Sequence, residues 1–428
     1  MRLLNVKTRE LVNFTDYSTP LYAVLSHRWS GDELSYDDYC LVLQARRRLP
    51  ITPGQALDTT TTELQSRVLE ITNTVGYRKI EGFCKFARED HQTWMYDIAE
   101  LSEAVISMWY YYQHAARCYV YLSDVFVEFK GQRIMTTRGR DTASEWFSRG
   151  WTLQELLAPR DLLFCDATWK PIALLRKDSA EQTDNGLVAL LSEFTGIPER
   201  FLASNNRFTE ASIAQKMSWM AERSTTRIED TAYGLLGLFG IDMPPLYGEG
   251  KRAFIRLQKE IIQRSDDESI FAWRNDWAHG HYYDRRREGC FRPGLLATEP
   301  KDFRDCGNIA PIEPNLRIPY RITNRGLEFN SRTILIHLEG ETDHWQTYLV
   351  RLACAETIGG VAHPCLIALR CAQETHSVSA GRLLAVGREF ICETRGRLHN
   401  IYRDAMPRHA LLDMEDTFKQ QLFYIKLS

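Results

Sequence analysis

Two short apolar runs, each ending in polar side chains, constrain the fold of this chain more than any other feature of its sequence. The first is LYAVLSHRW (21–29) and the second is CYVYLSDV (118–125), and a helical pattern directly precedes the second run. Short runs rich in β-branched and aromatic residues predict strands that are buried on both faces. A strand, a helix and another strand in this order predict an α/β fold with a mostly parallel sheet.

The helix before the second strand is predicted from the spacing of its apolar residues. They form one face: Leu101, Ala104, Val105, Met108, Trp109, Tyr112 and Ala116. Glu100 lies at the margin of this face in the first helical turn, where a carboxylate can face a cleft. Between the first strand and this helix, Pro50, Pro53 and four consecutive threonines predict an irregular insertion near 41–75, which ends in a helix around 63–72.

The sequence predicts three domains. The α/β domain covers 1–170, a helical extension covers 171–275, and a β-rich, largely antiparallel domain covers 276–428. In the extension, Thr226 and Glu229 have the spacing of a capping box that starts a helix ended by Gly240. The inward stripe expected for that helix is Ile228, Ala232, Leu235, Leu236 and Phe239. A second amphipathic helix is predicted with Phe254, Leu257 and Ile261 inward.

Charge and cysteine content limit the classes of function. Lys and Arg total 53 against 56 Asp and Glu, a net charge of −3 that offers no field for attracting nucleic acid. The longest apolar run, YGLLGLFGI, is half the length of a membrane span. Ten cysteines without a C-x-x-C pair predict reduced thiols and neither a metal site nor a disulfide framework. We therefore expect a cytoplasmic protein with no membrane span, no metal and no cofactor.

Familiar catalytic motifs are absent, so the candidate residues come from position. The sequence contains no G-x-S-x-G, H-E-x-x-H or G-x-G-x-x-G. Asp97 and Glu100 have the spacing of a helix cap, which explains both carboxylates without a ligand. The alternative is that Glu100 lies at the mouth of the sheet, where ligands collect beyond the carboxyl ends of parallel strands. There it would stabilise a developing cationic sugar.

Two other stretches allow both a packing and a ligand-binding interpretation. Ser26 and His27 are neighbours on one strand, so their side chains point to opposite faces and do not form a catalytic pair. Trp29 either forms a wall of a pocket or fills the core. In EWFSRGWTLQELLAP (145–159) the aromatic residues can bury a large apolar area. The same stretch also suits an aromatic, anionic ligand such as a nucleotide, because it adds Arg149, Gln154 and Glu155.

Several ordered blocks resemble the fungal heterokaryon-incompatibility (HET) domain family. They are MRLLNVKTRELVNF with PLYAVLSHRW, GYRKIEGFCKFA, AELSEAVISMWYYYQHAARCYVYLSDV, EWFSRGWTLQELLAP, KMSWMAERSTTRIEDTAYGLLGLFGIDMPPLYGEGKRAFIRLQKEII and SDDESIFAW. This resemblance covers about 1–273 and is closest to members with a helical region after the HET domain. It implies a TIR-like, flavodoxin-like α/β fold and a role in non-self recognition that triggers programmed cell death.

The resemblance also implies site residues and chemistry. The Ser-x-x-Trp strand end of the family matches Ser26 and Trp29, and its glutamate before the helix matches Glu100, with Asp97 beside it. The motif Arg-x-Trp-x-x-Gln-Glu matches a set in the second stretch, namely Arg149, Trp151, Gln154 and Glu155. Because some TIR relatives cleave NAD with a glutamate at a comparable helix, the resemblance implies NAD as a substrate and Glu100 as the catalytic carboxylate.

Two alternatives to NAD cleavage stay open. The chain can be a non-catalytic signalling module that self-associates or binds other proteins. It can also be an inactive, diverged paralogue, because the segment TWMYDIAELSE is shorter than the strand and loop that the family carries there. Activity depends on one geometric expectation, which is that Glu100 converges with Arg149, Trp151, Gln154 and Glu155 at one rim of the sheet.

Overall fold

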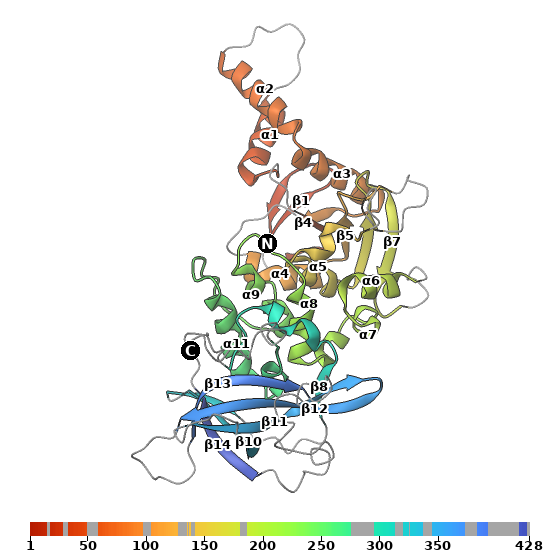
Figure 1. Cartoon of the computed structure of the whole chain (residues 1–428). Helices are drawn as coiled ribbons and strands as arrows, with labels where there is room; N and C mark the ends of the chain where they lie inside the picture. Colours follow the sequence, from red (N-terminus) through yellow and green to blue (C-terminus); the bar gives the residue numbers. More distant parts are fainter. Residues whose placement is uncertain are drawn as a thin grey trace. The chain divides into compact units, whose positions relative to one another are not determined.

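The computed structural model divides into two compact units, Met1–Asn206 and Arg207–Ser428 (Figure 1). The residues that the structure describes are 1–14, 18–28, 33–48, 59–96, 104–126, 135, 137, 142–179, 186–274, 295–312, 320–324, 326–336, 345–372, 383–392 and 419–425. Each unit is built on a sheet of seven strands. The two sheets differ in strand direction, so each unit is described by itself.

The sheet of the first unit is parallel at its centre and antiparallel at its edges. Its strands are β1 (Arg2–Asn5), β2 (Leu11–Asn13), β3 (Ala23–His27), β4 (Trp94–Tyr96), β5 (Arg117–Tyr121), β6 (Asp161–Cys165) and β7 (Pro171–Arg176), in the order β2-β1-β4-β3-β5-β6-β7. The strands β4, β3, β5 and β6 are parallel. Every residue of β3 is buried, as expected for a strand covered on both faces. The predicted α/β fold with a mostly parallel central sheet is confirmed.

Helices connect the parallel strands and cover the two faces of this sheet. They are α1 (Tyr36–Arg48), α2 (Thr59–Thr72) and α3 (Val75–Glu89) after β3, α4 (Ala104–Gln113) after β4, and the 3-10 helix η2 (Glu145–Ser148) with α5 (Thr152–Leu157) after β5. On one face, Phe83 of α3 packs on Tyr119 of β5 with ring centroids 5.3 Å apart. On the other face, α5 contacts both β3 and α4. Two further helices, α6 (Leu187–Thr195) and α7 (Glu199–Leu202), follow β7.

The structure corrects the prediction that the insertion begins irregularly. Residues up to Arg48 form α1, whose buried residues Tyr39, Val42 and Ala45 recur every three positions. The hydroxyl of Ser35 accepts the N–H of Asp38 at 3.1 Å, which caps the helix. The predicted helix around 63–72 is confirmed as the carboxyl-terminal part of α2.

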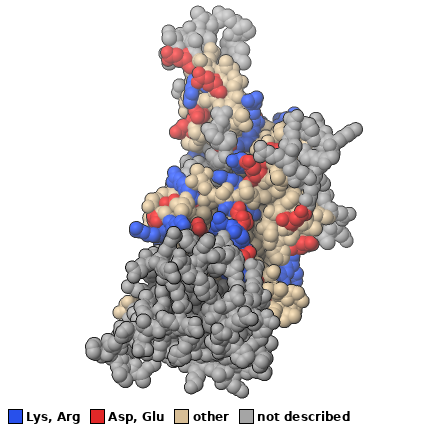
Figure 2. All heavy atoms as spheres, in the orientation of Figure 1, with Lys and Arg blue, Asp and Glu red and all other residues tan. Residues whose placement is uncertain are grey.

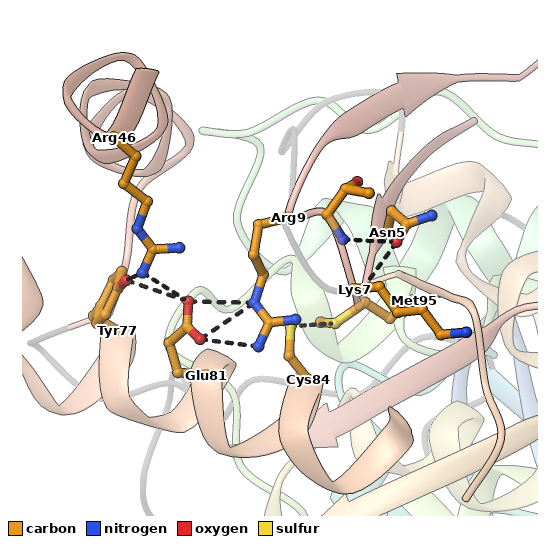
Figure 3. A network of polar contacts seen from close by, with 9 residues as sticks. Asn5, Lys7, Arg9, Arg46, Tyr77, Glu81, Cys84 and Met95 are labelled. Carbon is orange, nitrogen blue, oxygen red and sulfur yellow. Dashed lines mark hydrogen bonds and ion pairs between the residues drawn. The ribbon is translucent and has the colours of Figure 1, made fainter. Parts of the chain in front are cut away.

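A polar network joins the first hairpin to two helices (Figure 3). Arg9 has a left-handed backbone (φ 63°) in the turn between β1 and β2. Its guanidinium donates to both carboxylate oxygens of Glu81 on α3, with the shortest contact at 3.0 Å. Glu81 also accepts the Tyr77 hydroxyl at 3.2 Å and pairs with Arg46 of α1 at 3.4 Å. One carboxylate thus holds α1, α3 and the hairpin together.

The sheet of the second unit is largely antiparallel. Its strands are β8 (Ile309–Pro311), β9 (Arg321–Thr323), β10 (Gly326–Ile336), β11 (Trp345–Ile358), β12 (Val361–Ala372), β13 (Leu383–Cys392) and β14 (Lys419–Ile425). Their order is β8-β11-β12-β13-β14-β10-β9, and β10 also pairs with β11. Among the described strands of this second sheet, only β13 and β14 pair in parallel. Strands therefore cover the β-rich segments that the sequence indicates after Trp273.

Helices precede this sheet in the same unit. They are η4 (Arg207–Glu210), α8 (Ile213–Ala221), α9 (Asp230–Tyr233), α10 (Leu236–Phe239), α11 (Arg252–Arg264), η5 (Glu268–Phe271) and η7 (Pro300–Cys306). In α11 the predicted inward residues Phe254, Leu257 and Ile261 are buried, so that prediction is confirmed. Gly240 ends α10 with a left-handed backbone (φ 62°), as expected.

The predicted capping box at Thr226 and Glu229 is wrong. The expected single helix is two short helices, α9 and α10. The carboxylate of Glu229 accepts the backbone N–H groups of Gly248 and Gly250 at 2.8 and 3.0 Å, while Ile228 is 46% exposed instead of inward. Tertiary contacts with the turn around Gly248 outweigh the local helix signal, because the turn offers the carboxylate two backbone donors at once.

Candidate functional site

The carboxyl end of β3 lies at the switch point of the parallel sheet. In chain order the four parallel strands are β3, β4, β5 and β6, but in space β4 and β5 lie on opposite sides of β3. The connections from β3 to β4 and from β5 to β6 therefore run in opposite directions. In sheets of this kind a crevice opens beyond the carboxyl ends of the strands where the order reverses. Ser26 and His27 end β3 at this point.

Ser26 joins two distant segments through a buried hydrogen-bond chain. Its hydroxyl donates to Oε2 of Glu155 on α5 at 2.5 Å and accepts the indole N–H of Trp146 at 2.8 Å. Ser26 is 0%, Trp146 1% and Glu155 5% exposed. Burial removes a carboxylate from water, and a hydrogen bond donated by a hydroxyl group replaces part of the lost hydration. The chain Trp146–Ser26–Glu155 therefore locks η2 and α5 onto the end of β3.

The sequence from 144 to 155 folds this way because its own polar groups close the turn. Ser144 caps η2, accepting the N–H of Trp146 at 3.3 Å, and donates its hydroxyl to Asp124 at 2.5 Å. The hydroxyl of Thr152 contacts the carbonyl oxygens of Trp146 and Arg149 at 2.7 and 2.8 Å. These contacts satisfy backbone groups that a turn would otherwise leave unpaired in the interior. The turn presents Trp146 edge-on to Phe147.

A buried lysine supports α5 from its other end. Lys177, which is 0% exposed, donates to the carbonyl oxygens of Leu156 and Leu157 at 2.9 and 2.6 Å. Burial lowers the pKa of Lys177 to about 7, because the charged ammonium loses its hydration. Burial also raises the pKa of the Cys118 thiol, and the charge of Glu155 adds to that rise. Sequence reasoning missed Lys177, since LLRKDS resembles a strand end entering water.

His27 points to the opposite face of the sheet and belongs to a second cluster. Nζ of Lys79 on α3 lies 2.7 Å from Nδ1 of His27 and 2.5 Å from Oε2 of Glu33. Lys79 and His27 are both 6% exposed. Nδ1 of His27 also lies 3.2 Å from the carbonyl oxygen of Arg28. As expected, Ser26 and His27 do not form a pair.

Arg28, the residue after His27, extends β3 towards η2. Its guanidinium forms an ion pair with Glu145, the first residue of η2, and both side chains are about half exposed. A pair in this setting is screened by water and contributes little to stability. The pair lies next to the buried hydrogen-bond chain in the sequence, because Arg28 is two positions after Ser26 and Glu145 directly precedes Trp146. Figure 2 shows acidic and basic side chains interspersed over the described part of the surface that faces the viewer.

The structure brings together some of the predicted site residues. Ser26 and Glu155 are hydrogen bonded, Gln154 lies beside Glu155 with 1% exposure, and Arg149 and Trp151 are half-buried between η2 and α5. Trp29, Asp97 and Glu100 lie outside the described residues, so the expected convergence of Glu100 with the other four stays a prediction. Sequence reasoning missed Lys79, Glu33 and Asp124, because nothing in their own neighbourhood identifies their distant partners.

The described part of the chain offers neither a metal cluster nor a membrane-spanning helix. Within the described ranges, no group of three or more His, Cys, Asp or Glu side chains has the arrangement of a metal site. Seven cysteines in the described part of the chain carry free thiols, and six of these are buried. No helix in the described segments is long and apolar enough to cross a membrane.

Comparisons with known proteins identify two similarities. A family model described as "Domain of unknown function (DUF8212)" matches residues 252–319, which include α11 and η7. The chain is also 32% identical over 260 residues to "Vegetative incompatibility protein HET-E-1" of Podospora anserina. This match covers 58% of the chain but 16% of the relative. No solved structure matches. Over more than half of its length, the chain is therefore similar to a vegetative incompatibility protein.

Proposed function

We propose that this chain acts in fungal vegetative incompatibility, and that Met1–Asn206 is the unit that triggers cell death after non-self recognition. The observation that carries the proposal is the 32% identity to a vegetative incompatibility protein. A second observation supports it, which is that two of the HET-like sequence blocks meet at the end of β3. Ser26 and Glu155, 129 positions apart, are hydrogen bonded there. The role places the protein in the cytoplasm, with self-association or protein partners.

For the first unit we propose a TIR-like, flavodoxin-like arrangement. Numbered by their appearance in the chain, the parallel strands have the spatial order 2-1-3-4. Flavodoxin-like sheets have the order 2-1-3-4-5 and bind their ligands between strands 1 and 3. Here β7 occupies the fifth position and is antiparallel to β6. The corresponding ligand position is the end of β3 beside β5, where Ser26 and His27 lie.

The proposed chemistry is cleavage of NAD, with Glu100 as the essential carboxylate. The bond between nicotinamide and ribose breaks, nicotinamide leaves with the bonding electrons, and water adds to the ribose carbon with release of a proton. A carboxylate lowers the barrier by stabilising the cationic sugar that develops in the transition state. Support comes from the sheet topology, because Glu100 follows the carboxyl end of β4, the strand beside β3.

In this proposal Ser26 and Glu155 are positioning residues, whereas Trp29, Asp97, Arg149 and Trp151 contact the ligand. Ser26, Gln154 and Glu155 are almost fully buried, so a ligand in the crevice reaches the turn around Arg149 more easily than these three side chains. The buried chain then fixes the direction in which Arg149 and Trp151 point. Precise positioning matters because small displacements of contacting groups cost large factors in rate.

Growth of a fungal host that expresses the chain from an inducible promoter tests the role. We expect wild type to arrest growth, Glu100→Gln to lose the arrest, and Glu63→Gln, on the exposed face of α2, to retain it. Purified wild type should release nicotinamide from NAD, and Glu100→Gln should not. Arrest by wild type without nicotinamide release, retained in Glu100→Gln, would favour the self-associating module. Wild type without any effect on growth would contradict the role itself.

A further inference from the structure

The second unit contains a hollow of about 130 Å³ that the proposed function does not use. It lies where the end of α8, the start of α11 and the start of η7 meet. Its apolar wall includes Met220, Ala221 and Phe254, all of which are buried. Hydroxyl groups come from Thr231 and Thr298. The hollow therefore combines an apolar wall with a few polar groups, which is the usual composition of a small-molecule site.

Positive charge dominates the lining of this hollow. Arg223, Lys251 and Lys301 line it, against the single carboxylate of Glu299. Glu299 already lies 3.6 Å from Nζ of Lys251, and the two side chains are 44% and 55% exposed. The lining therefore has an excess of two positive charges. An anion that enters the hollow meets this excess, although water screens the exposed Lys251 and Lys301, so the charge contributes only modestly to binding.

At the start of α11, beside the hollow, the side-chain charges are opposite to those that a helix amino terminus favours. Lys251 is the N-cap residue and Arg252 follows it, and the first turn contains no acidic residue. The helix dipole favours negative charge at an amino terminus, so two cations there oppose it. Such local conflicts are expected at functional positions, where another interaction compensates for them. A bound anion would compensate here, because it would interact favourably with the helix terminus and with Lys251, which lines the hollow.

The volume limits what can bind. An apolar cavity of about 150 Å³ accommodates benzene, whereas drug-sized ligands occupy about 300 Å³ or more. A hollow of about 130 Å³ thus holds one ring or one branched chain, and a nucleotide is too large for it. We propose that the hollow binds a compact carboxylate whose apolar body is a single ring or branched chain. The carboxylate faces Lys301 and Lys251, and the apolar body lies against Phe254 and Ala221.

Calorimetry on the full chain with phenylacetate as the probe tests this proposal. Wild type should bind phenylacetate, and neutral benzyl alcohol should bind roughly tenfold more weakly because it lacks the charge-assisted contacts. N-acetylphenylalanine then distinguishes two possible sources of the carboxylate, the end of a polypeptide and a free small acid. Tighter binding than phenylacetate indicates the end of a polypeptide, and weaker binding indicates a free small acid.

Variants of the lining complete the test. Lys301→Gln should weaken phenylacetate binding roughly threefold, with a smaller effect at high salt. Lys259→Gln, on α11 outside the lining, should leave binding unchanged. Ala221→Leu fills the hollow and should abolish binding; if this variant does not fold, Lys301→Gln still decides. The proposal is overturned if phenylacetate does not bind at roughly ten millimolar, if benzyl alcohol binds equally well, or if Lys301→Gln has no effect.

Discussion

At the end of β3, each face of the sheet buries a cluster of polar side chains, and the two clusters are stabilised by different contacts. On the α5 face, Ser26 connects an indole donor to a carboxylate acceptor, Trp146 to Glu155. On the α3 face, His27 and Glu33 both surround the ammonium group of Lys79. The first cluster is closed by a large aromatic side chain, and the second is held by ionic contacts with Glu33 12% exposed at its edge.

This difference indicates which of the two clusters holds the fold rigidly and which tolerates change. An aromatic side chain in a dry interior contributes packing as well as a hydrogen bond, so the α5 face should be rigid. An ionic cluster beside water exchanges its contacts more easily, because the desolvation cost and the Coulomb gain nearly cancel. We therefore expect the α5 face to set stability and the α3 face to tolerate change.

The largest expected effect comes from Trp146. Trp146→Ala should lower the free energy of unfolding of the first unit by about 3–5 kcal/mol, because it opens a cavity and removes the donor to Ser26. Trp146→Phe keeps most of the volume and should cost about 1–3 kcal/mol. Denaturant unfolding followed by circular dichroism measures both values. A loss below 1 kcal/mol for Trp146→Ala would contradict the rigid role of this face.

The next effect concerns pH and the support of α5 by Lys177. Its pKa is lowered to about 7 in the folded protein from an ordinary value of 10.5. The unfolded chain therefore binds more protons between these values, and stability rises with pH through this window, by up to about 1.4 kcal/mol per unit. Below pH 7 both states are protonated, so this group adds no slope.

Lys177→Met isolates that contribution. The variant should lose the rise in stability between pH 7 and 9, which denaturant unfolding at several pH values measures. Lys259→Met, at a half-buried position in the other unit, is the matched control and should keep the rise. An unchanged slope in Lys177→Met would show that another group causes it.

The smallest effect is expected on the α3 face. Lys79→Met keeps the length of the side chain but removes the donor to Glu33 and His27, and should cost about 1–2 kcal/mol because water can reach Glu33. Thermal unfolding of Lys79→Met beside Trp146→Ala gives the direct comparison. If Lys79→Met destabilises the unit as much as Trp146→Ala, the proposed division between the two faces is wrong.

Local patterns predicted the elements whose burial is continuous. The runs that became β3 and β5 are apolar because both faces of the sheet are covered, and the stripe of α11 is strict because one side packs inward. The patterns failed where distant contacts decide the structure. Glu229 matches a capping box locally, but the turn around Gly248 takes its carboxylate.

The site was predictable only in part for the same reason. Ser26 and Glu155 were identified from family-like blocks, but the hydrogen bonds of Ser26 to Glu155 and to Trp146 join residues more than a hundred positions apart. Lys79 lies in the middle of a helix, where sequence alone suggests a solvated side chain. Charged residues that are buried by a tertiary partner carry no mark of that partner in their own neighbourhood.

The helices α1 and α2 enter the chain between β3 and β4, two strands that must pair side by side. Closing a longer loop costs entropy that grows only with the logarithm of its length, about 0.6 kcal/mol for each doubling. Extra residues in this crossover are therefore cheap at equilibrium. Their cost is kinetic, because pairing across a greater sequence separation slows folding and leaves both strand edges exposed for longer. Newly made chains should thus depend most on protection from aggregation at the moment before β4 joins β3.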